Sequence, residues 1–154
     1  MFIDMLVIQA FLKGDIMPWI TRCSKKDIQC GTHINPNNCI LIQISDTCSE
    51  PPKPYYRHHF KLIYQFEFMD FDVGDENSIV MGITTNDAKN IADIIKYCFT
   101  NNINILVHCV MGVSRSGGVC EAAEAFGFEY IRPDKINCPN ILVKSSILKI
   151  LNNG

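Results

Sequence analysis

The sequence predicts an α/β fold, with a central, mostly parallel and twisted sheet flanked by helices on both faces. Two short apolar runs, 39–45 and 103–107, are rich in β-branched residues, as strands buried on both faces usually are. Two segments of helical character, 85–99 and 116–126, alternate with these runs along the chain. Strands that alternate with helices are typical of parallel sheets with right-handed crossovers. Such sheets bind ligands beyond the carboxyl ends of their strands.

The N-terminal half is predicted to supply strands and one short helix. We expect strands at 2–11 and 16–20, followed by a helix over 24–30 that is capped by the serine at its start. The apolar segment 39–45 is the clearest strand of this half. The segment 62–68 alternates less regularly, but its aromatic and β-branched residues favour a strand.

The C-terminal half is predicted to contain the helices that cover the sheet. An acidic loop without periodicity spans 70–81. The segment 85–99 has apolar residues at helical spacing, with Thr84 or Thr85 as its N-cap. After the helix at 116–126, Pro139 suits the first turn of a final helix that runs through residue 151.

Length and composition indicate one domain, 1–154. The chain is 47% hydrophobic and 19% charged with a formal net charge of -2, which is typical of a globular protein. The acidic balance gives no support to a nucleic-acid or anionic-membrane partner. The apolar stretch 5–8 is too short for the core of a signal peptide, and Asp4 precedes it where a cationic residue is usual. We therefore expect a cytoplasmic protein.

The eight cysteines show no pattern of a metal site. They stand at positions 23, 30, 39, 48, 98, 109, 120 and 138, without a C-x2-C or C-x4-C pair. This spacing disfavours a zinc site, and we expect neither a metal nor a cofactor. Reduced thiols, most of them small core residues, are the expected state.

The segment 108–116, H-C-V-M-G-V-S-R-S, is the most informative part of the chain. It connects the predicted strand at 103–107 to the helix at 116–126. A tight loop that leaves a strand and enters a helix directs several backbone N–H groups at one place, where the helix dipole adds positive character. The loop is therefore predicted to bind an anion.

The side chains of this loop indicate phosphoryl chemistry. Cys109 faces the helix N-terminus and Arg115, and both favour a thiolate over a thiol. Arg115 carries a planar fork of donors that matches two oxygens of a phosphate. A sulfur nucleophile and a phosphate ligand at this spacing predict attack on phosphorus and a phosphocysteine intermediate.

The pattern H-C-x5-R-S resembles the signature of the cysteine-dependent protein tyrosine phosphatases, in the form found in compact dual-specificity phosphatases. The resemblance implies the same fold. It also implies that Cys109 is the nucleophile, Arg115 the ligand of the phosphate and transition state, and Ser116 the hydroxyl that stabilises the leaving thiolate. His108 would adjust the thiolate pKa without touching the substrate. The loop that would bind phosphate, mainly through its backbone, consists of Val110, Met111, Gly112, Val113 and Ser114.

An alternative reading of the segment is a buried structural cysteine with an unrelated arginine nearby. The strand before it, the helix after it, Gly112 and the paired serines Ser114 and Ser116 all disfavour that reading. Two glycines, Gly117 and Gly118, replace the bulkier residues that are common after R-S in the subgroup. They weaken the first helical turn, and they serve either close packing or loop mobility.

A general acid is required because an alkoxide or phenoxide leaves poorly unless it is protonated. The run Phe68-x-Asp70-Phe71-Asp72 resembles the family's F-x-D-x-D pattern, whose first aspartate is the acid. We therefore expect Asp70 to be the acid, with Asp72 second and Asp75 third. The alternative is a solvated acidic loop with no catalytic part.

Cys120 could form a disulfide with oxidised Cys109, although a helix residue that faces the sheet is the simpler interpretation. For the substrate, the leading expectation is phosphotyrosine in proteins, with phosphoserine and phosphothreonine as further substrates. The alternatives are a phosphoinositide phosphatase, an RNA 5′-phosphatase, and a catalytically weak phosphate-binding module. The apolar loop residues Val110, Met111 and Val113 disfavour ligands with several phosphates. The oligomeric state is left open.

Overall fold

The computed structural model describes residues 16–72, 74 and 81–153, and these residues form a five-stranded sheet with the order β3-β2-β4-β1-β5. All four neighbouring strand pairs are parallel. The strands are β1 (Trp19–Ser24), β2 (Cys39–Ser45), β3 (Ile63–Glu67), β4 (Asn104–Cys109) and β5 (Glu129–Tyr130). The central position of β4 puts its carboxyl end in the middle of one edge of the sheet.

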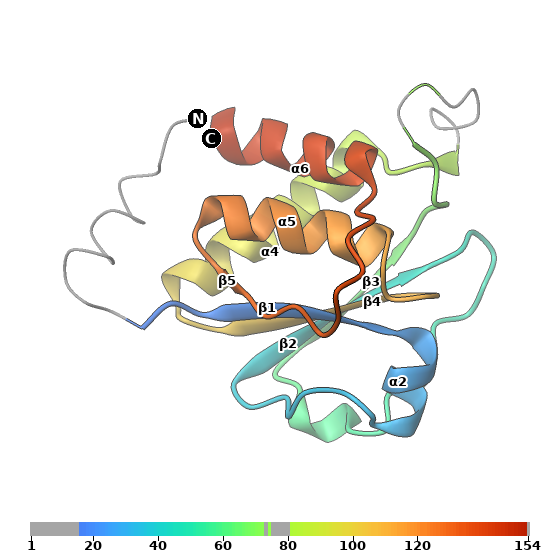
Figure 1. The fold of residues 1–154 in the computed structure, drawn as a ribbon, viewed down its shortest axis with the longest axis vertical. Coiled ribbons are helices and arrows are strands. Elements are labelled where there is room, and N and C mark those ends of the chain that lie inside the picture. Colours follow the sequence, from blue (N-terminus) through green and yellow to red (C-terminus); the bar gives the residue numbers. More distant parts are fainter. Residues whose placement is uncertain (1–15, 73, 75–80, 154) are drawn as a thin grey trace.

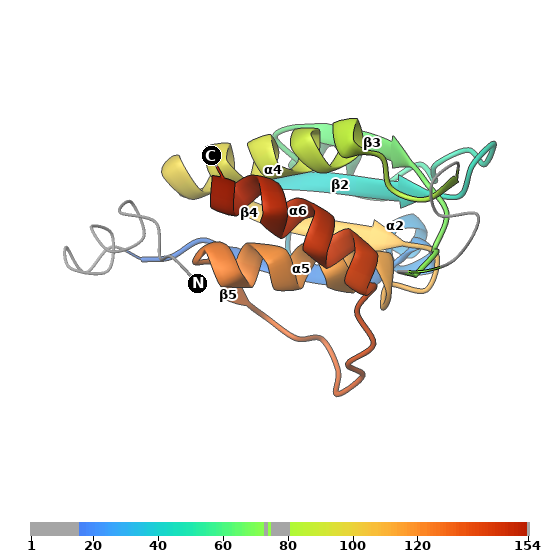
Figure 2. The same cartoon turned by 90° about the horizontal axis from the view of Figure 1, so that it is seen from above.

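Helices cover both faces of the sheet, as predicted, but unequally (Figures 1 and 2). Three long helices, α4 (Thr85–Thr100), α5 (Arg115–Phe126) and α6 (Ile141–Asn153), lie on one face. The helices α4 and α5 contact the sheet, and α6 packs against both of them. The other face carries α2 (Lys25–Cys30) and the 3-10 turn η1 (Arg57–His59).

The alternation of side chains along β4 divides the core into two parts. Ile105, Val107 and Cys109 belong to the large apolar cluster under α4, α5 and α6. Leu106 belongs to the smaller cluster under α2. His108 follows the same alternation, so its side chain lies on the face opposite to that of Cys109.

Several predicted strands agree with the structure. β2 has the predicted bounds, β3 is shorter by one residue at each end, and β4 continues to Cys109. The bounds predicted for the strand at 16–20 are wrong, because β1 runs from Trp19 to Ser24 and includes two buried polar residues. Thr21 and Arg22 are buried there because residues of the connection after β5 satisfy their side chains. The predicted strand at 2–11 lies outside the described residues.

The observed helix caps agree with those predicted from the sequence for α2 and α4, but the start of the last helix differs. Ser24 caps α2 and Thr84 caps α4, each through a reciprocal bond with an aspartate three residues later. Pro139 does not open the final helix. Asn140 precedes α6 instead, and its side-chain oxygen accepts from Val143 N at 2.9 Å. Two short elements, β5 and η1, were not predicted from the sequence; they are only two and three residues long.

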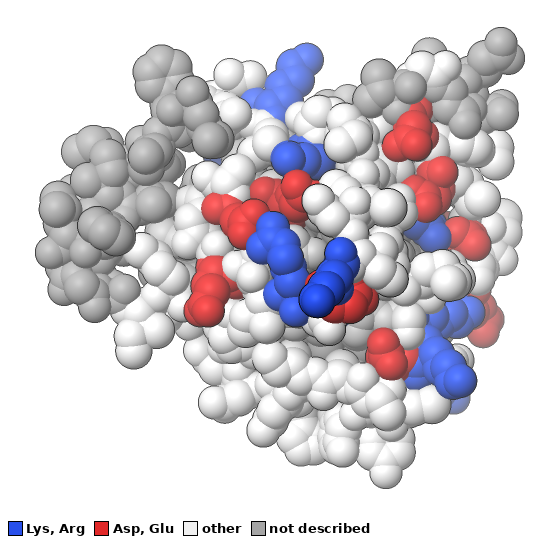
Figure 3. Space-filling model, in the orientation of Figure 1, with Lys and Arg blue, Asp and Glu red and all other residues white. Residues whose placement is uncertain are grey.

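Among the helices of the described residues, none is both long and apolar enough to span a bilayer. On the face shown in Figure 3, acidic and basic side chains of the described residues lie interspersed.

Candidate active site

The candidate site lies at the carboxyl end of the sheet, where the segment 108–116 joins β4 to α5. Ser24, the last residue of β1, pairs with Cys109, the last residue of β4. The loop 110–114 then leads directly into α5 at Arg115. The loop therefore lies above the ends of β1 and β4, where a parallel sheet usually binds its ligand.

Cys109 lies at the base of this loop with its side chain largely buried, at 2% exposure. Its Sγ is 3.2 Å from the Oγ of Ser116, which is fully buried in the first turn of α5. A hydroxyl at this distance can donate a hydrogen bond to a thiolate. Ser116 is the second residue of α5, so the start of this helix brings the donor to Cys109.

Arg115 is held by its Nη1 atom. Nη1 donates to the carbonyl oxygen of Phe68 at 2.7 Å and forms an ion pair with Asp46 at 2.8 Å. Arg115 is 4% exposed, and its Nε is buried without a hydrogen-bond partner among the described residues. A buried N–H donor without a partner is costly, so this edge of the guanidinium suits an anion that completes its hydrogen bonding.

Glycine is required at the apex of the loop. Gly112 has φ 72°, and a Cβ atom there would lie 2.3 Å from the carbonyl carbon of Cys23. The loop is thus pressed against the end of β1. The backbone N of Lys25 also donates to the carbonyl oxygen of Val110 at 3.1 Å, which anchors the loop to the start of α2.

The remaining loop residues form the rim of the site. Val110 and Met111 are exposed, at 39% and 76%, whereas Val113 and Ser114 are half-buried. None of the three apolar side chains adds charge to the loop. Their contribution to binding an anion can therefore come only from their backbone.

Asp70 is attached to the same loop. Its Oδ1 accepts from Ser114 Oγ at 2.8 Å and from Asn140 Nδ2 at 2.6 Å. Asp72 is exposed and makes no side-chain hydrogen bond or ion pair within the described part of the chain. Asp75 lies outside that part. Of the two aspartates that the structure describes, Asp70 is therefore the one that it brings to the loop.

His108 does not reach the sulfur of Cys109. Its Nδ1 is 3.4 Å from the carbonyl oxygen of Cys109, and its side chain lies on the other face of the sheet. Burial lowers the pKa of His108 to about 4, and the nearby cations Lys25 and Arg115 act in the same direction. His108 is thus neutral near pH 7 and can act on the site only through the backbone.

Comparison with solved structures agrees with this architecture. The tyrosine phosphatase Tk-PTP, in its active form, matches 90% of this chain and 93% of its own chain, with 14% sequence identity and a TM-score of 0.51. This chain has a tyrosine phosphatase fold. OH1 of Orf virus, described as a tyrosine phosphatase with triple substrate specificity, matches 71% of the chain at 18% identity and a TM-score of 0.43. The matched part spans 54% of the length of OH1. No family model and no curated protein matches the sequence.

Two residues of the candidate site on this phosphatase fold, Asp46 and Asn140, were not predicted from the sequence. Asp46 directly follows β2, and its position at the carboxyl end of a buried strand is a signal that was available in the sequence. Asn140 is buried and joins three segments: its backbone N donates to Ser114 O at 2.8 Å, and its side chain contacts Asp70 and α6. From the sequence, Asn140 was expected only to lie at the start of the final helix.

The structure shows close packing at the two glycines after Arg115. A Cβ atom on Gly118 would lie 2.7 Å from the carbonyl oxygen of Asn140, whereas one on Gly117 would lie 3.3 Å from Cα of Pro139. Gly118 therefore permits the backbone of Asn140 to approach α5. This approach brings the amide of Asn140 to Asp70.

All eight cysteines are free thiols. Cys120 is fully buried in α5, and burial raises its pKa well above that of an ordinary thiol. Burial also raises the pKa values of Cys39 and Cys98 to about 12. Within the described ranges, no group of three or more His, Cys, Asp or Glu side chains could hold a metal ion.

Proposed function

We propose that this protein is a cysteine-dependent phosphatase that hydrolyses phosphotyrosine in proteins, and also phosphoserine and phosphothreonine, through a phosphocysteine intermediate. The observation that carries the proposal is the arrangement around Cys109. Its Sγ lies 3.2 Å from Ser116 Oγ, at the base of a loop that ends at Arg115. The buried Nε of Arg115, without a partner in the described structure, is a donor suited to a phosphate oxygen.

In the first step, the Cys109 thiolate attacks phosphorus and the bond between phosphorus and the leaving oxygen breaks. Asp70 gives its proton to that oxygen, so a neutral alcohol or phenol departs. Arg115 and the loop N–H groups stabilise the charge on the equatorial oxygens. The product of this step is phosphocysteine and an ionised Asp70.

In the second step, Asp70 accepts a proton from water as the water oxygen attacks phosphorus. The bond between phosphorus and sulfur breaks, and Cys109 leaves as a thiolate while inorganic phosphate forms. The hydroxyl of Ser116 can donate to this thiolate, which makes it a better leaving group. The cycle returns Cys109 and Asp70 to their starting states.

A phosphorylated protein is the substrate class that the rim of the site supports. The exposed Val110 and Met111 leave the loop accessible to a side chain that projects from a protein surface. Phosphoinositides and RNA 5′-triphosphates carry further phosphates. The loop 110–114 offers no cationic side chain for them.

The test is an assay of the purified protein on phosphotyrosine peptides, phosphoserine peptides, phosphoinositides and 5′-triphosphorylated RNA. We expect the phosphotyrosine peptides to be hydrolysed fastest. Cys109→Ser should abolish turnover while retaining the fold and phosphate binding, and Arg115→Lys should impair both binding and rate. Cys30→Ser, at an exposed cysteine, is the matched control. Full turnover by Cys109→Ser would contradict the proposal.

A further inference from the structure

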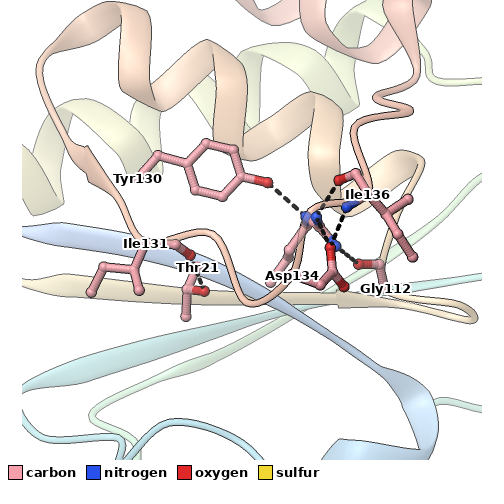
Figure 4. A network of polar contacts seen from close by, with 7 residues as sticks. Thr21, Gly112, Tyr130, Ile131, Asp134 and Ile136 are labelled. Carbon is pink, nitrogen blue, oxygen red and sulfur yellow. Dashed lines mark hydrogen bonds and ion pairs between the residues drawn. The ribbon is translucent and has the colours of Figure 1, made fainter.

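Arg22 is a buried cation that the proposed mechanism does not use. It lies in β1, is 3% exposed, and makes four hydrogen bonds through its guanidinium. The four acceptors, which are labelled in Figure 4, belong to two segments of the chain. Gly112 O accepts at 2.7 Å, and the segment 130–136 supplies Tyr130 Oη at 2.6 Å, Asp134 Oδ1 at 2.9 Å and Ile136 O at 2.8 Å. One of them, Gly112, is the apex of the candidate phosphate-binding loop.

The guanidinium remains charged in this position. Burial alone would lower the pKa of Arg22, but the hydrogen bonds to Asp134 and Tyr130, together with the charge interactions with the same two groups, raise it. Asp134 is partly exposed, whereas the guanidinium is not. Arg22 therefore places a permanent positive charge directly behind the loop.

Two carbonyl groups of the loop are directed toward β1 and α2. Gly112 O accepts from Arg22 Nη1, and Val110 O accepts from the backbone N of Lys25. The peptide bonds of the described chain are trans, and in a trans peptide the N–H points opposite to the C=O. The N–H groups that follow these two carbonyls, those of Val113 and Met111, therefore point away from β1.

We propose that Arg22 is a positioning residue for phosphate binding: by holding the carbonyl of Gly112, it orients the Val113 N–H toward the phosphate. The inference rests on the proposed function. The bonds to Tyr130, Asp134 and Ile136 fix the guanidinium from the other side, so its Nη1 cannot follow a movement of the loop. Gly112 has φ 72°, which lies in the left-handed region of backbone conformation that glycine adopts readily. Because glycine can adopt many backbone conformations, the bond from Arg22 is needed to select one orientation of its carbonyl group.

If Arg22 served only the stability of the fold, any variant that loosens the connection after β5 would weaken phosphate binding. Thr21 provides the control for this alternative. Thr21 Oγ1 donates to Ile131 O at 2.5 Å, so this residue of β1 holds the same connection after β5 without a hydrogen bond to the loop 110–114. A second control is Arg132, an exposed arginine over the ring of Tyr130, which is paired with Glu124. The variants Thr21→Val and Arg132→Gln should leave phosphate binding unchanged within about twofold.

The experiment measures the inhibition constant of inorganic phosphate, together with kcat and KM on p-nitrophenyl phosphate and the melting temperature. For Arg22→Gln we expect the inhibition constant and KM to rise about tenfold or more, because a charge-assisted bond and an aligned N–H donor are both lost. Thr21→Val should lower the melting temperature without this change. Should Arg22→Gln fail to fold, Arg22→Lys replaces it, with an expected rise of about threefold or more because lysine lacks the fork.

Unchanged phosphate inhibition in a folded Arg22 variant would overturn the inference and leave the proposed function standing. An equal loss of phosphate affinity in Thr21→Val would also overturn it, since stability alone would then explain both results. A wild-type protein that neither hydrolyses p-nitrophenyl phosphate nor binds phosphate would overturn the proposed function, and the inference with it.

Discussion

The side-chain nitrogen Nδ2 of Asn140 lies 2.6 Å from Oδ1 of Asp70, a residue 70 positions earlier in the chain. Ser114 Oγ donates to the same oxygen at 2.8 Å. Because Oδ1 accepts from two donors, the proton of a neutral Asp70 belongs on Oδ2. The two contacts therefore both place the carboxyl group beside the loop and select the oxygen that carries the proton.

We predict that Asp70→Asn slows hydrolysis by roughly 10²-fold or more for substrates with poor leaving groups, which is the usual contribution of a general acid. The effect should be smaller for p-nitrophenyl phosphate, because nitrophenolate leaves without protonation. The measurement is kcat for a series of aryl and alkyl phosphates. Asp72→Asn is the matched control, and a larger loss in that variant would reverse the assignment.

Asn140→Ala should act on both stability and rate. It removes the bond to Asp70, a second bond to Phe71 O at 3.1 Å and the acceptor for Val143 N. Loss of a helix cap alone costs about 1 kcal/mol. We expect urea denaturation to show at least this loss, and kcat on poor leaving groups to fall more than kcat on p-nitrophenyl phosphate. Asn90→Ala, on the exposed side of α4, should change neither, and an equal loss of rate on all substrates would argue against a role through Asp70.

The two glycines of α5 should respond differently to alanine. Helix propensity favours alanine over glycine by about 1 kcal/mol at either position. At Gly118 the new Cβ atom would lie 2.7 Å from Asn140 O, so the entry to α6 must move. We therefore expect Gly118→Ala to lower the melting temperature and the rate, and to do so more than Gly117→Ala. Greater stability in Gly118→Ala than in the wild-type protein would contradict the close packing.

The burial of His108 predicts a loss of stability in mild acid. The pKa of His108 is about 4 in the folded protein, below its usual value of 6.5, so the unfolded chain binds more protons between these values. The free energy of unfolding should therefore be highest above pH 6.5 and should fall by about 3 kcal/mol as the pH drops to 4. Urea denaturation across this range tests the prediction. The dependence of the free energy of unfolding on pH should become weaker in His108→Gln. It should remain in His58→Gln, because His58 is exposed.

If the free energy of unfolding changed with pH in His108→Gln as it does in the wild-type protein, groups other than His108 would cause the effect.

The local features of this chain were accessible from its sequence because they depend on neighbouring residues. The bounds of β2, the caps Ser24 and Thr84 and the loop between β4 and α5 all follow from short-range patterns. Predictions from the sequence were wrong where a partner far away in the chain decides the structure. The polar residue Arg22 continues β1 only because the segment 130–136 and Gly112 satisfy its guanidinium.

By itself the sequence determined an α/β fold and the segment 108–116 with its cysteine, arginine and serines, because strand, loop and helix follow one another directly along the chain. Only the tertiary structure decided which acidic residue lies at the loop, what holds Arg115, and which glycine permits the close approach of α6. Asp70 and Asn140 contact the loop at Ser114, and Asp46 contacts Arg115, through the parallel arrangement of the strands and the packing of α6 on α5. Hydrogen bonds between residues so far apart in the chain form only after the sheet and helices have assembled, so no local pattern can encode them.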